Sequence, residues 1–221
     1  MKAKIKLIVQ VLISIPKSFY VNAHFFSLKK AIKLPILVHW RTKLNRLNGA
    51  IEFAEISTGI VKIGFSGSFA LSERGNCFLD VAGRIRFEGK ASFAHSSQII
   101  VNPNGFLQFG NNFRCNTNCI INCSKSISFG EDCLLAWNNS ILDTDGHKII
   151  DCLTKEQTNN ANDIKVGNHV WLCPNVTILK KTIIPNHCVV ATNQVVSKKY
   201  NDEYCLIGSS GYLKRNIDWE E

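Results

Sequence analysis

The sequence lacks the features that mark several large protein classes. It has no Cys-x-x-Cys pair among its nine cysteines, so a structural zinc site or a dithiol redox pair is not expected. Leu, Ala, Glu and Lys do not dominate its composition, which argues against a long helical bundle. No zinc finger, helix-turn-helix or RNA-binding motif accompanies its basic residues. Cys115, Cys119 and Cys123, spaced by four, are best interpreted as small buried residues in a reducing cytosol.

Acidic residues are also scarce relative to basic ones. The chain has 221 residues, with 26 Lys and Arg against 17 Asp and Glu, giving a formal net charge of +9. Such a balance suits nucleic acid, an anionic membrane surface, or a polyanionic substrate or cofactor. Because no nucleic-acid motif is present, nucleic acid is the least favoured of these partners. A composition of 45% hydrophobic and 19% charged residues is typical of a soluble globular protein.

The only long apolar run near the start, Leu7 to Ile15, is too short to cross a bilayer. Polar residues recur around it at spacings of three and four: Lys6, Gln10, Ser14 and Lys17. This pattern predicts a helix with one polar stripe and a wide apolar face, ended by Pro16. Val21-Asn22-Ala23 would suit a signal peptidase, so an export signal is the alternative. We favour an amphipathic helix over residues 1–16 that lies on a membrane or on the protein itself.

The strongest signal is a six-residue period in the second half of the chain. An aliphatic residue returns at every sixth position: Val166, Leu172, Ile178, Ile184, Val190 and Val196. Four places after the first four of these stand small or branched residues: Val170, Val176, Thr182 and Cys188. Neither an α-helix nor a simple alternating strand produces this period. It predicts a solenoid whose three-sided coils each point such residues inward and stack like parallel strands.

The same period runs upstream, with slips where turns hold extra residues. Its members are Phe87, Phe93 and Ile99, then Phe109, Cys115, Ile121 and Ile127, then Phe129, Leu135 and Ile141. The predicted fold is therefore an all-β parallel β-helix with a short N-terminal helix and a C-terminal tail. Residues 1–60 are expected to form the helix and capping strands, residues 61–200 the β-helix, and residues 201–221 the tail. The handedness of the coil does not follow from the spacing.

The candidate catalytic residues lie beside one break in the six-residue period. After Asp143, Asp145 and His147 the chain becomes polar, and the period resumes only at Val166. A coil that opens to extrude a loop, here expected over residues 147–165, usually does so for function. His147 has two carboxylates within four residues, which favours a catalytic imidazole over a surface one.

One tryptophan stands where it cannot fill the core column. Trp171 occupies the last place of the hexad 166–171, at a predicted corner, where it could line a cleft or cover a neighbouring chain. Trp137 could line the same cleft, and a packing role is equally open for it.

These motifs resemble the hexapeptide-repeat acyltransferases, the left-handed β-helix group that includes maltose, galactoside and capsule O-acetyltransferases. The resemblance covers about residues 60–215 and is densest at Asp143–His147 and Val166–Lys198. In order and separation, His147 followed by Val170-Trp171-Leu172 fits the His and later Val-Trp-[Ile/Leu] of the family. The segment from Lys17 to Leu47 further resembles enzymes of bacterial capsule and lipopolysaccharide biosynthesis.

The resemblance implies an acetyl-CoA-dependent O-acetyltransferase that acts on a sugar hydroxyl of a cell-surface glycan or its precursor. His147 would be the general base, with Asp143 or Asp145 holding its second ring nitrogen. Trp171 would wall the thioester site, and Trp137 and Asn138 would contact the acceptor. The remaining residues implied to contact the acyl donor are Cys173, Thr192, Ser197, Lys198 and Arg215. The resemblance implies no metal. It implies a cytoplasmic homotrimer with active sites between subunits. For this chain, residues 1–16 could add a peripheral contact with the inner membrane.

Two other functions remain open at this point. The chain has Cys173 and Lys181 where the family usually has glycine, which suggests a catalytically impaired scaffold or a polysaccharide-binding protein. A zinc hydratase on the same fold would need histidines from adjacent coils. Only His95, His147 and His169 are considered for that role, and no pair among them has the close spacing such a site requires.

Overall fold

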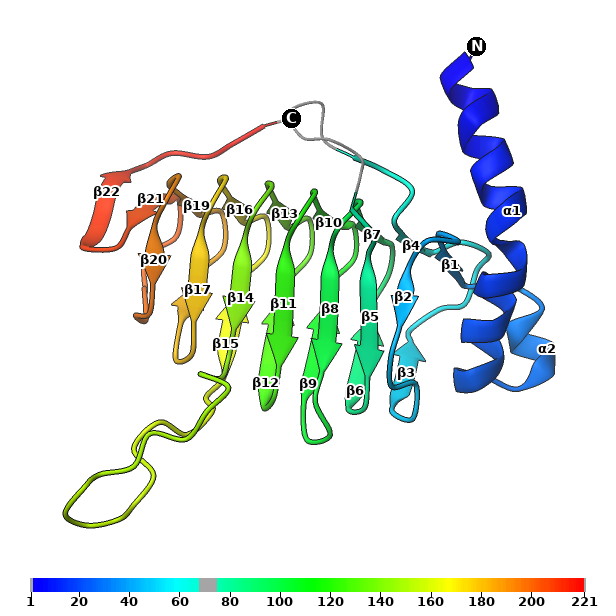
Figure 1. Ribbon diagram of the computed structural model, residues 1–221. Helices are drawn as coiled ribbons and strands as arrows, with labels where there is room; N and C mark the ends of the chain where they lie inside the picture. Colours follow the sequence, from blue (N-terminus) through cyan, green and yellow to red (C-terminus); the bar gives the residue numbers. More distant parts are fainter. Residues whose placement is uncertain (1, 68–74, 221) are drawn as a thin grey trace.

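The computed structural model describes residues 2–67 and 75–220, and its strands form the three walls of a parallel β-helix (Figure 1). Face A contains β1 (Ile36–Val38), β4 (Val61–Ile63), β7 (Ala91–Phe93), β10 (Phe113–Cys115), β13 (Leu134–Leu135), β16 (Trp171–Leu172), β19 (Val189–Val190), β21 (Cys205–Gly208) and β22 (Gly211–Arg215). Face B contains β2 (Lys43–Leu44), β5 (Phe78–Val81), β8 (Gln98–Val101), β11 (Ile120–Cys123), β14 (Ser140–Leu142), β17 (Thr177–Leu179) and β20 (Val195–Val196). Face C contains β3 (Ala50–Phe53), β6 (Arg84–Phe87), β9 (Phe106–Phe109), β12 (Ser126–Phe129), β15 (Ile164–Val166) and β18 (Ile183–Ile184).

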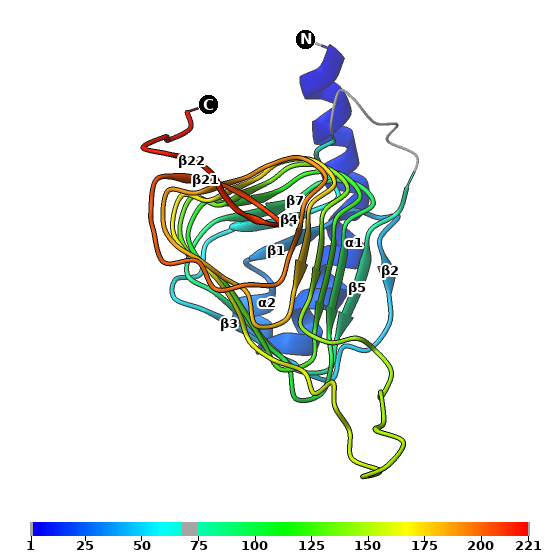
Figure 2. The same cartoon turned by 90° about the vertical axis from the view of Figure 1, so that its left-hand side faces the viewer.

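The chain visits faces A, B and C in turn and winds left-handed from the N-terminal to the C-terminal end (Figures 1 and 2). The predicted all-β solenoid is therefore confirmed. Trp171 in β16 pairs with Val189 in β19, three hexads later, so the period sets the length of a regular coil. Among the described strands only β21 and β22 pair antiparallel, and this hairpin ends face A.

The core follows the predicted columns. The aliphatic residues from Val166 to Val196 that return every sixth position are all buried, as are the aromatic and aliphatic members upstream. Inside face C four phenylalanines, Phe53, Phe87, Phe109 and Phe129, stack with ring centroids 5.3 to 5.7 Å apart. Each buried aromatic stabilises the coil by roughly 1.5–3 kcal/mol, so stacking of coils supplies the stability that one coil lacks.

Asparagine rather than glycine forms the corner between faces A and B. Asn118, Asn138 and Asn175 have positive φ angles of 62°, 62° and 59°, which asparagine tolerates better than most residues. Their side chains form a ladder, in which Asn118 donates to Asn138 at 2.8 Å and Asn138 donates to Asn175 at 3.0 Å. The corner turns are thereby tied together from coil to coil.

The N-terminal region differs from its prediction in two respects. Helix α1 (Lys2–Phe25) continues through Pro16, so the prediction that this proline ends the helix is wrong. The hydrogen bond that proline removes is outweighed by packing of the second half of α1 on β1. A short helix, α2 (Leu28–Ala31), follows. The first coil begins at Ile36 rather than near residue 61, because β1, β2 and β3 already pair with β4, β5 and β6.

Eight of the nine cysteines are buried, and none of them forms a disulfide in the described part of the chain. Cys115, Cys119 and Cys123 lie in the core, as predicted. Burial raises the pKa of the Cys77 thiol to about 11, so this thiol stays protonated at neutral pH. Cys152, in the extruded loop, is exposed.

Candidate functional site

The extruded loop is the largest departure from the coil. It leaves the corner between faces B and C after Leu142 and returns at Ile164, close to the predicted span of 147–165. Figures 1 and 2 both show it extending well away from the β-helix. An antiparallel bridge between Ile150 and Gln157 closes its outer part. The loop is therefore a defined arm whose base lies on one corner of the solenoid.

Asp143 fixes the start of this arm. Its buried carboxylate accepts hydrogen bonds from the backbone N–H groups of Ser124 at 2.7 Å, Lys125 at 2.7 Å and Ser126 at 2.9 Å. These donors belong to the same corner of the preceding coil. Three strong bonds occupy both oxygens, so in the single chain Asp143 holds the corner and not the predicted imidazole.

Asp145 fastens the base of the arm to the following coil. Its carboxylate pairs with Nζ of Lys180 at 2.5 Å and accepts from Nδ2 of Asn159 at 2.8 Å. The same Asn159 amide donates to the carbonyl oxygen of His147 at 2.7 Å, and its oxygen accepts from the N–H of Ile149 at 2.7 Å. The Lys180 ammonium and the Asn159 amide hold the pKa of the Asp145 carboxyl below its usual value. This network fixes the backbone of His147.

The His147 imidazole itself is exposed at the base of the arm. Within the described residues, no hydrogen bond, ion pair or ring contact reaches its two ring nitrogens. An imidazole held by its backbone with both nitrogens accessible can exchange a proton with a bound molecule. Ser197 and Lys198 lie on the same corner, one coil beyond Lys180, and both are exposed.

Trp171 lies on a different wall. It is in β16, not at a corner, and its side chain points outward from face A within an apolar column formed by Leu134, Trp171, Val189 and Leu206. The C-terminal tail covers this column: Trp219 is buried against it, with its ring centroid 6.0 Å from that of Trp171. Cys173, which follows on face A, belongs to the same cluster.

The other predicted residues lie in two further places. Trp137, Asn138 and Thr192 lie at the corner between faces A and B, where Asn138 is part of the asparagine ladder. Arg215 lies in β22, where it forms an ion pair with Asp202 and lies over the Tyr212 ring.

The structure therefore separates the two central residues of the predicted site. The corner that carries His147 is the one opposite face A, which carries Trp171. One chain does not bring the two rings into a common groove.

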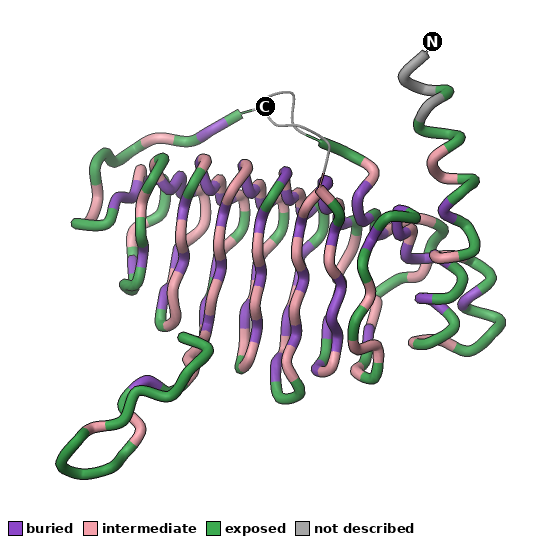
Figure 3. Tube along the Cα trace, viewed as in Figure 1, coloured by how far each residue is buried: buried purple, intermediate pink, exposed green. Residues whose placement is uncertain are grey.

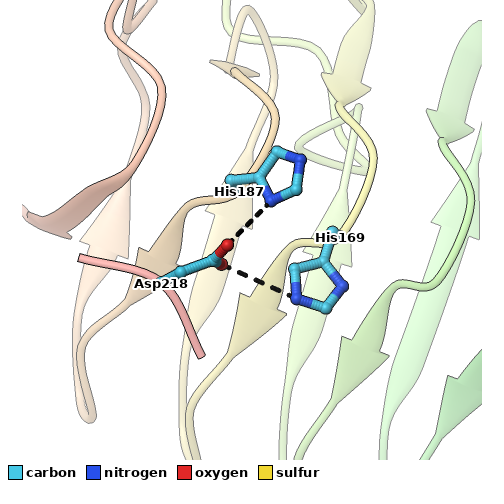
Figure 4. A group of neighbouring side chains, drawn as sticks. All are labelled: His169, His187 and Asp218. Carbon is cyan, nitrogen blue, oxygen red and sulfur yellow. Dashed lines mark hydrogen bonds and ion pairs between the residues drawn. The ribbon is translucent and has the colours of Figure 1, made fainter. Parts of the chain in front are cut away.

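A cluster that the sequence analysis did not identify lies at the corner between faces C and A (Figure 4). His187 Nδ1 is 3.0 Å from Asp218 Oδ2, and His169 Nε2 is 3.6 Å from Asp218 Oδ1. Their ligand atoms lie within 4.8 Å of one another, an arrangement that can hold a divalent metal ion. The two histidines stand one regular coil apart, a spacing that marks them as neighbours once the period is known.

Hydrogen bonds and a ring contact join this cluster to the C-terminal tail. His169 Nε2 lies 3.0 Å from the carbonyl oxygen of Trp219, whose indole N–H donates to the carbonyl oxygen of His169 at 2.9 Å. The Trp219 ring stacks on His169 with centroids 4.4 Å apart. We interpret His169, His187 and Asp218 as the fastening of the tail over face A.

Comparison with known proteins gives matches to O-acetyltransferases but to no protein-family model. The polysialic acid O-acetyltransferase of Neisseria meningitidis is 50% identical over 54 residues, which are 24% of this chain and 25% of that protein. WbbJ of Escherichia coli strain K12, a candidate lipopolysaccharide biosynthesis O-acetyl transferase, is 28% identical over 152 residues, 65% of this chain and 78% of that protein. The chain thus spans only about a quarter of the meningococcal relative.

Among solved structures, the polysialic acid O-acetyltransferase OatWY is 26% identical, with a TM-score of 0.47 over 84% of this chain and 87% of that one. The chain is a left-handed parallel β-helix similar to the hexapeptide-repeat acyltransferases, and in sequence it is similar to a polysialic acid O-acetyltransferase and to a candidate O-acetyl transferase of lipopolysaccharide biosynthesis.

Proposed function

We propose that this protein is an acetyl-CoA-dependent O-acetyltransferase that acetylates a sugar hydroxyl of a cell-surface glycan or its precursor. The single observation that carries the proposal is the tethered arm, which presents an accessible imidazole at the corner where the coil opens. The similarity to polysialic acid and lipopolysaccharide O-acetyltransferases supports the reaction type and the class of acceptor.

His147 is the general base of this reaction. A sugar hydroxyl is a poor nucleophile, so a neutral imidazole takes its proton as the oxygen attacks the carbonyl carbon of the acetyl thioester. The tetrahedral intermediate then collapses, the carbon–sulfur bond breaks, and the leaving CoA thiolate takes from the imidazolium the proton that came from the sugar hydroxyl. Imidazole can both accept and donate a proton, so one side chain can carry out both transfers.

The acidic residues position the arm. Asp143 anchors its first residue to the preceding coil, and Asp145 links its base to Lys180 and Asn159. These roles differ from the expected one, in which a carboxylate holds a ring nitrogen of His147 and so orients the imidazole. Both carboxylates act on His147 through the backbone.

The complete site lies between two chains. Because His147 and Trp171 lie on opposite sides of the triangular coil, the arm of one subunit reaches the face A side of the next. Three such contacts close a homotrimer. In that assembly Trp171 and the tail residue Trp219 that packs on it supply an apolar wall, and the exposed Lys198 on the His147 corner suits the phosphates of CoA.

The proposal is tested by measuring thiol release from acetyl-CoA with polysialic acid and lipopolysaccharide oligosaccharides as acceptors. His147→Gln, which cannot take up a proton at neutral pH, is expected to lower the turnover rate by at least about 100-fold. His24→Gln, which changes a histidine on the surface of α1, is the matched control and should retain activity.

Full activity of His147→Gln would remove this residue from the mechanism. Absence of acetyl-CoA binding by the unmodified protein in calorimetry, at millimolar ligand, would contradict the acyl donor and the enzyme assignment together.

A further inference from the structure

Helix α1 places its polar residues against the protein, the reverse of the usual arrangement of a surface helix. Ser14, Ser18 and Asn22 lie one turn apart along α1 and are fully buried. They face β1, the edge strand of face A, whose backbone groups would otherwise have no neighbouring strand on that side. Of the polar stripe predicted from the sequence, Ser14 is buried and Lys17 Nζ donates to the carbonyl oxygens of Trp40 and Thr42, each at 2.7 Å. Ser18 and Asn22 are not part of that prediction.

The spacing of Ser14, Ser18 and Asn22 along α1 matches the spacing of backbone groups along β1. Four residues of a helix rise about 6 Å, close to the roughly 6.6 Å that two residues of a strand span. The N–H of Ile36 donates to Asn22 Oδ1 at 3.2 Å, and the carbonyl oxygen of Ile36 accepts from Asn22 Nδ2 at 2.7 Å. The N–H of Val38 donates to Ser18 Oγ at 2.9 Å. Side chains of α1 thus replace the missing strand.

The consequence is that the apolar residues of α1 point away from the body. Its exposed large apolar side chains are Ile5, Leu7, Ile8, Val9, Leu12, Ile13, Ile15, Phe19 and Tyr20. Leu12 is 59% exposed and Ile8 is 58% exposed, although both lie in an ordered helix. In Figures 1 and 3 the N-terminal half of α1 stands clear of the β-helix, and its described residues are largely exposed.

The exposed apolar surface of α1 continues onto the β-helix. A hollow of about 300 Å³ lies at its base; its apolar lining is Leu7 and Val11 of α1 with Leu37 and Phe65, and Lys62, Ser66 and Ser92 complete it. Contiguous apolar surface of this extent on an isolated helix is uncommon in a soluble monomer and marks a site of association.

The charge of the segment indicates what covers it. Lysines occupy positions 2, 4 and 6, at the outer end of α1, and no acidic residue lies in its first turn. An exposed apolar segment that carries three lysines in its sequence complements the acyl chains and head groups of anionic phospholipid. In the described residues no helix is long and apolar enough to cross a bilayer, so the complementary geometry is a helix at the membrane surface.

We propose that residues 5–20 of α1 bind the surface of a membrane that contains anionic phospholipid, and so hold the β-helix against it. This contact is independent of the proposed acetyl transfer. It would keep the arm and the solenoid close to acceptors carried by membrane lipids.

The test is co-sedimentation of the full chain with two kinds of vesicle, phosphatidylcholine alone and a three-to-one mixture of phosphatidylcholine and phosphatidylglycerol. We expect binding to the anionic vesicles that is at least about tenfold tighter than to the neutral ones and weakens with salt. Ile8→Gln combined with Leu12→Gln should reduce binding about tenfold or more. Leu213→Gln, which changes an equally exposed leucine on β22, is the matched control and should bind normally.

Failure of the unmodified chain to bind anionic vesicles would overturn the proposal, as would full binding by the double variant. A second copy of the chain is the other occupant to distinguish. If the mass of the assembly in solution falls when Ile8 and Leu12 are replaced, and vesicles do not compete with that association, α1 is a protein interface and the membrane proposal is wrong. Circular dichroism and melting temperature show whether both variants keep the fold.

Discussion

At the scale of single residues, the backbone conformation at the corners of the coil determines which residue types are tolerated there. Lys181 has a φ of 71°, a left-handed conformation that suits glycine, and stands where the family usually has glycine. Cys173 stands at another such position but does not have a positive φ, so its side chain adds bulk without backbone strain. The sequence showed both substitutions, but only the backbone angles separate the costly one from the tolerated one.

Replacing Lys181 by glycine is therefore expected to stabilise the protein. The substitution removes the contact between Cβ and the backbone that disfavours positive φ, which is worth about 1 kcal/mol. The N–H of residue 181 still donates to the carbonyl oxygen of Asp163 at 3.0 Å. Denaturant unfolding of Lys181→Gly and Lys181→Ala separates strain from charge, because only glycine relieves the strain. Equal unfolding free energies for the two variants would contradict this account.

A buried histidine gives the first coil a dependence on pH. His39 is 5% exposed, and its ring lies 5.6 Å from that of His95 and 5.5 Å from that of Phe65. Burial first, and then the nearby charges of His95, Arg41 and Lys17, lower the pKa of His39 to about 4. The folded state thus prefers the neutral ring, whereas the unfolded chain takes up a proton below pH ~6.5.

Stability should therefore be unaffected by His39 above pH ~6.5 and fall as the pH drops toward 4, by roughly 3 kcal/mol at most. Melting temperatures of the unmodified protein and His39→Gln, compared from pH 7 to pH 4.5, isolate this contribution from the carboxylates that both proteins share. The gap between the two curves should change by several degrees. Parallel curves would show that His39 does not titrate as described.

At the scale of elements, the period predicted the coils but not the ends of the solenoid. Inward aliphatic residues recur every sixth position because each wall repeats the same packing, so the pattern is legible from residue 87 onward. The first coil, beginning at β1, has irregular spacing and was expected to be a cap. The helix pattern was recognised, but a polar stripe alone does not tell whether it faces water or an edge strand.

The serines of the N-terminal region provide a matched test of this contact. Ser18 is fully buried and joins both the N–H and the carbonyl oxygen of Val38, at 2.9 and 3.3 Å. Ser27 is exposed and makes no side-chain cap bond. Ser18→Ala leaves the Val38 N–H without a partner and should lower the unfolding free energy by about 1–3 kcal/mol, whereas Ser27→Ala should change it little. Hydrogen exchange at Val38 should accelerate only in the first variant; equal exchange in both would show that α1 does not cap β1.

At the scale of the whole molecule, the tail and the arm determine how the site is assembled. The sequence suggested His147 and Trp171 as residues of one site, yet their positions on opposite sides of the coil depend on which corner each inserted residue occupies. It also gave no sign that Trp219 covers Trp171, because that contact joins residues 48 positions apart through the His169 and Asp218 pair. Contacts between residues so far apart in the sequence can be seen only in the folded structure.

A site shared between subunits makes a quantitative prediction. Trp171→Leu and His147→Gln should each be nearly inactive when pure, since each removes one half of every site. When the two are co-expressed and assemble at random in a trimer, about one quarter of the sites join an intact His147 of one chain to an intact Trp171 of the next. Acetyl transfer should therefore return to about a quarter of the unmodified level.

Co-expression of His147→Gln with the double variant His147→Gln/Trp171→Leu is the control, because no intact imidazole is then available to any site. Recovery in the first mixture and none in the second requires that the arm of one subunit acts on its neighbour. If both mixtures stay inactive while the trimers form normally, the two residues must work within one chain. The tail would then have to leave face A and the arm fold back across the solenoid, against the hydrogen bonds that hold Trp219 and Asp145 in place.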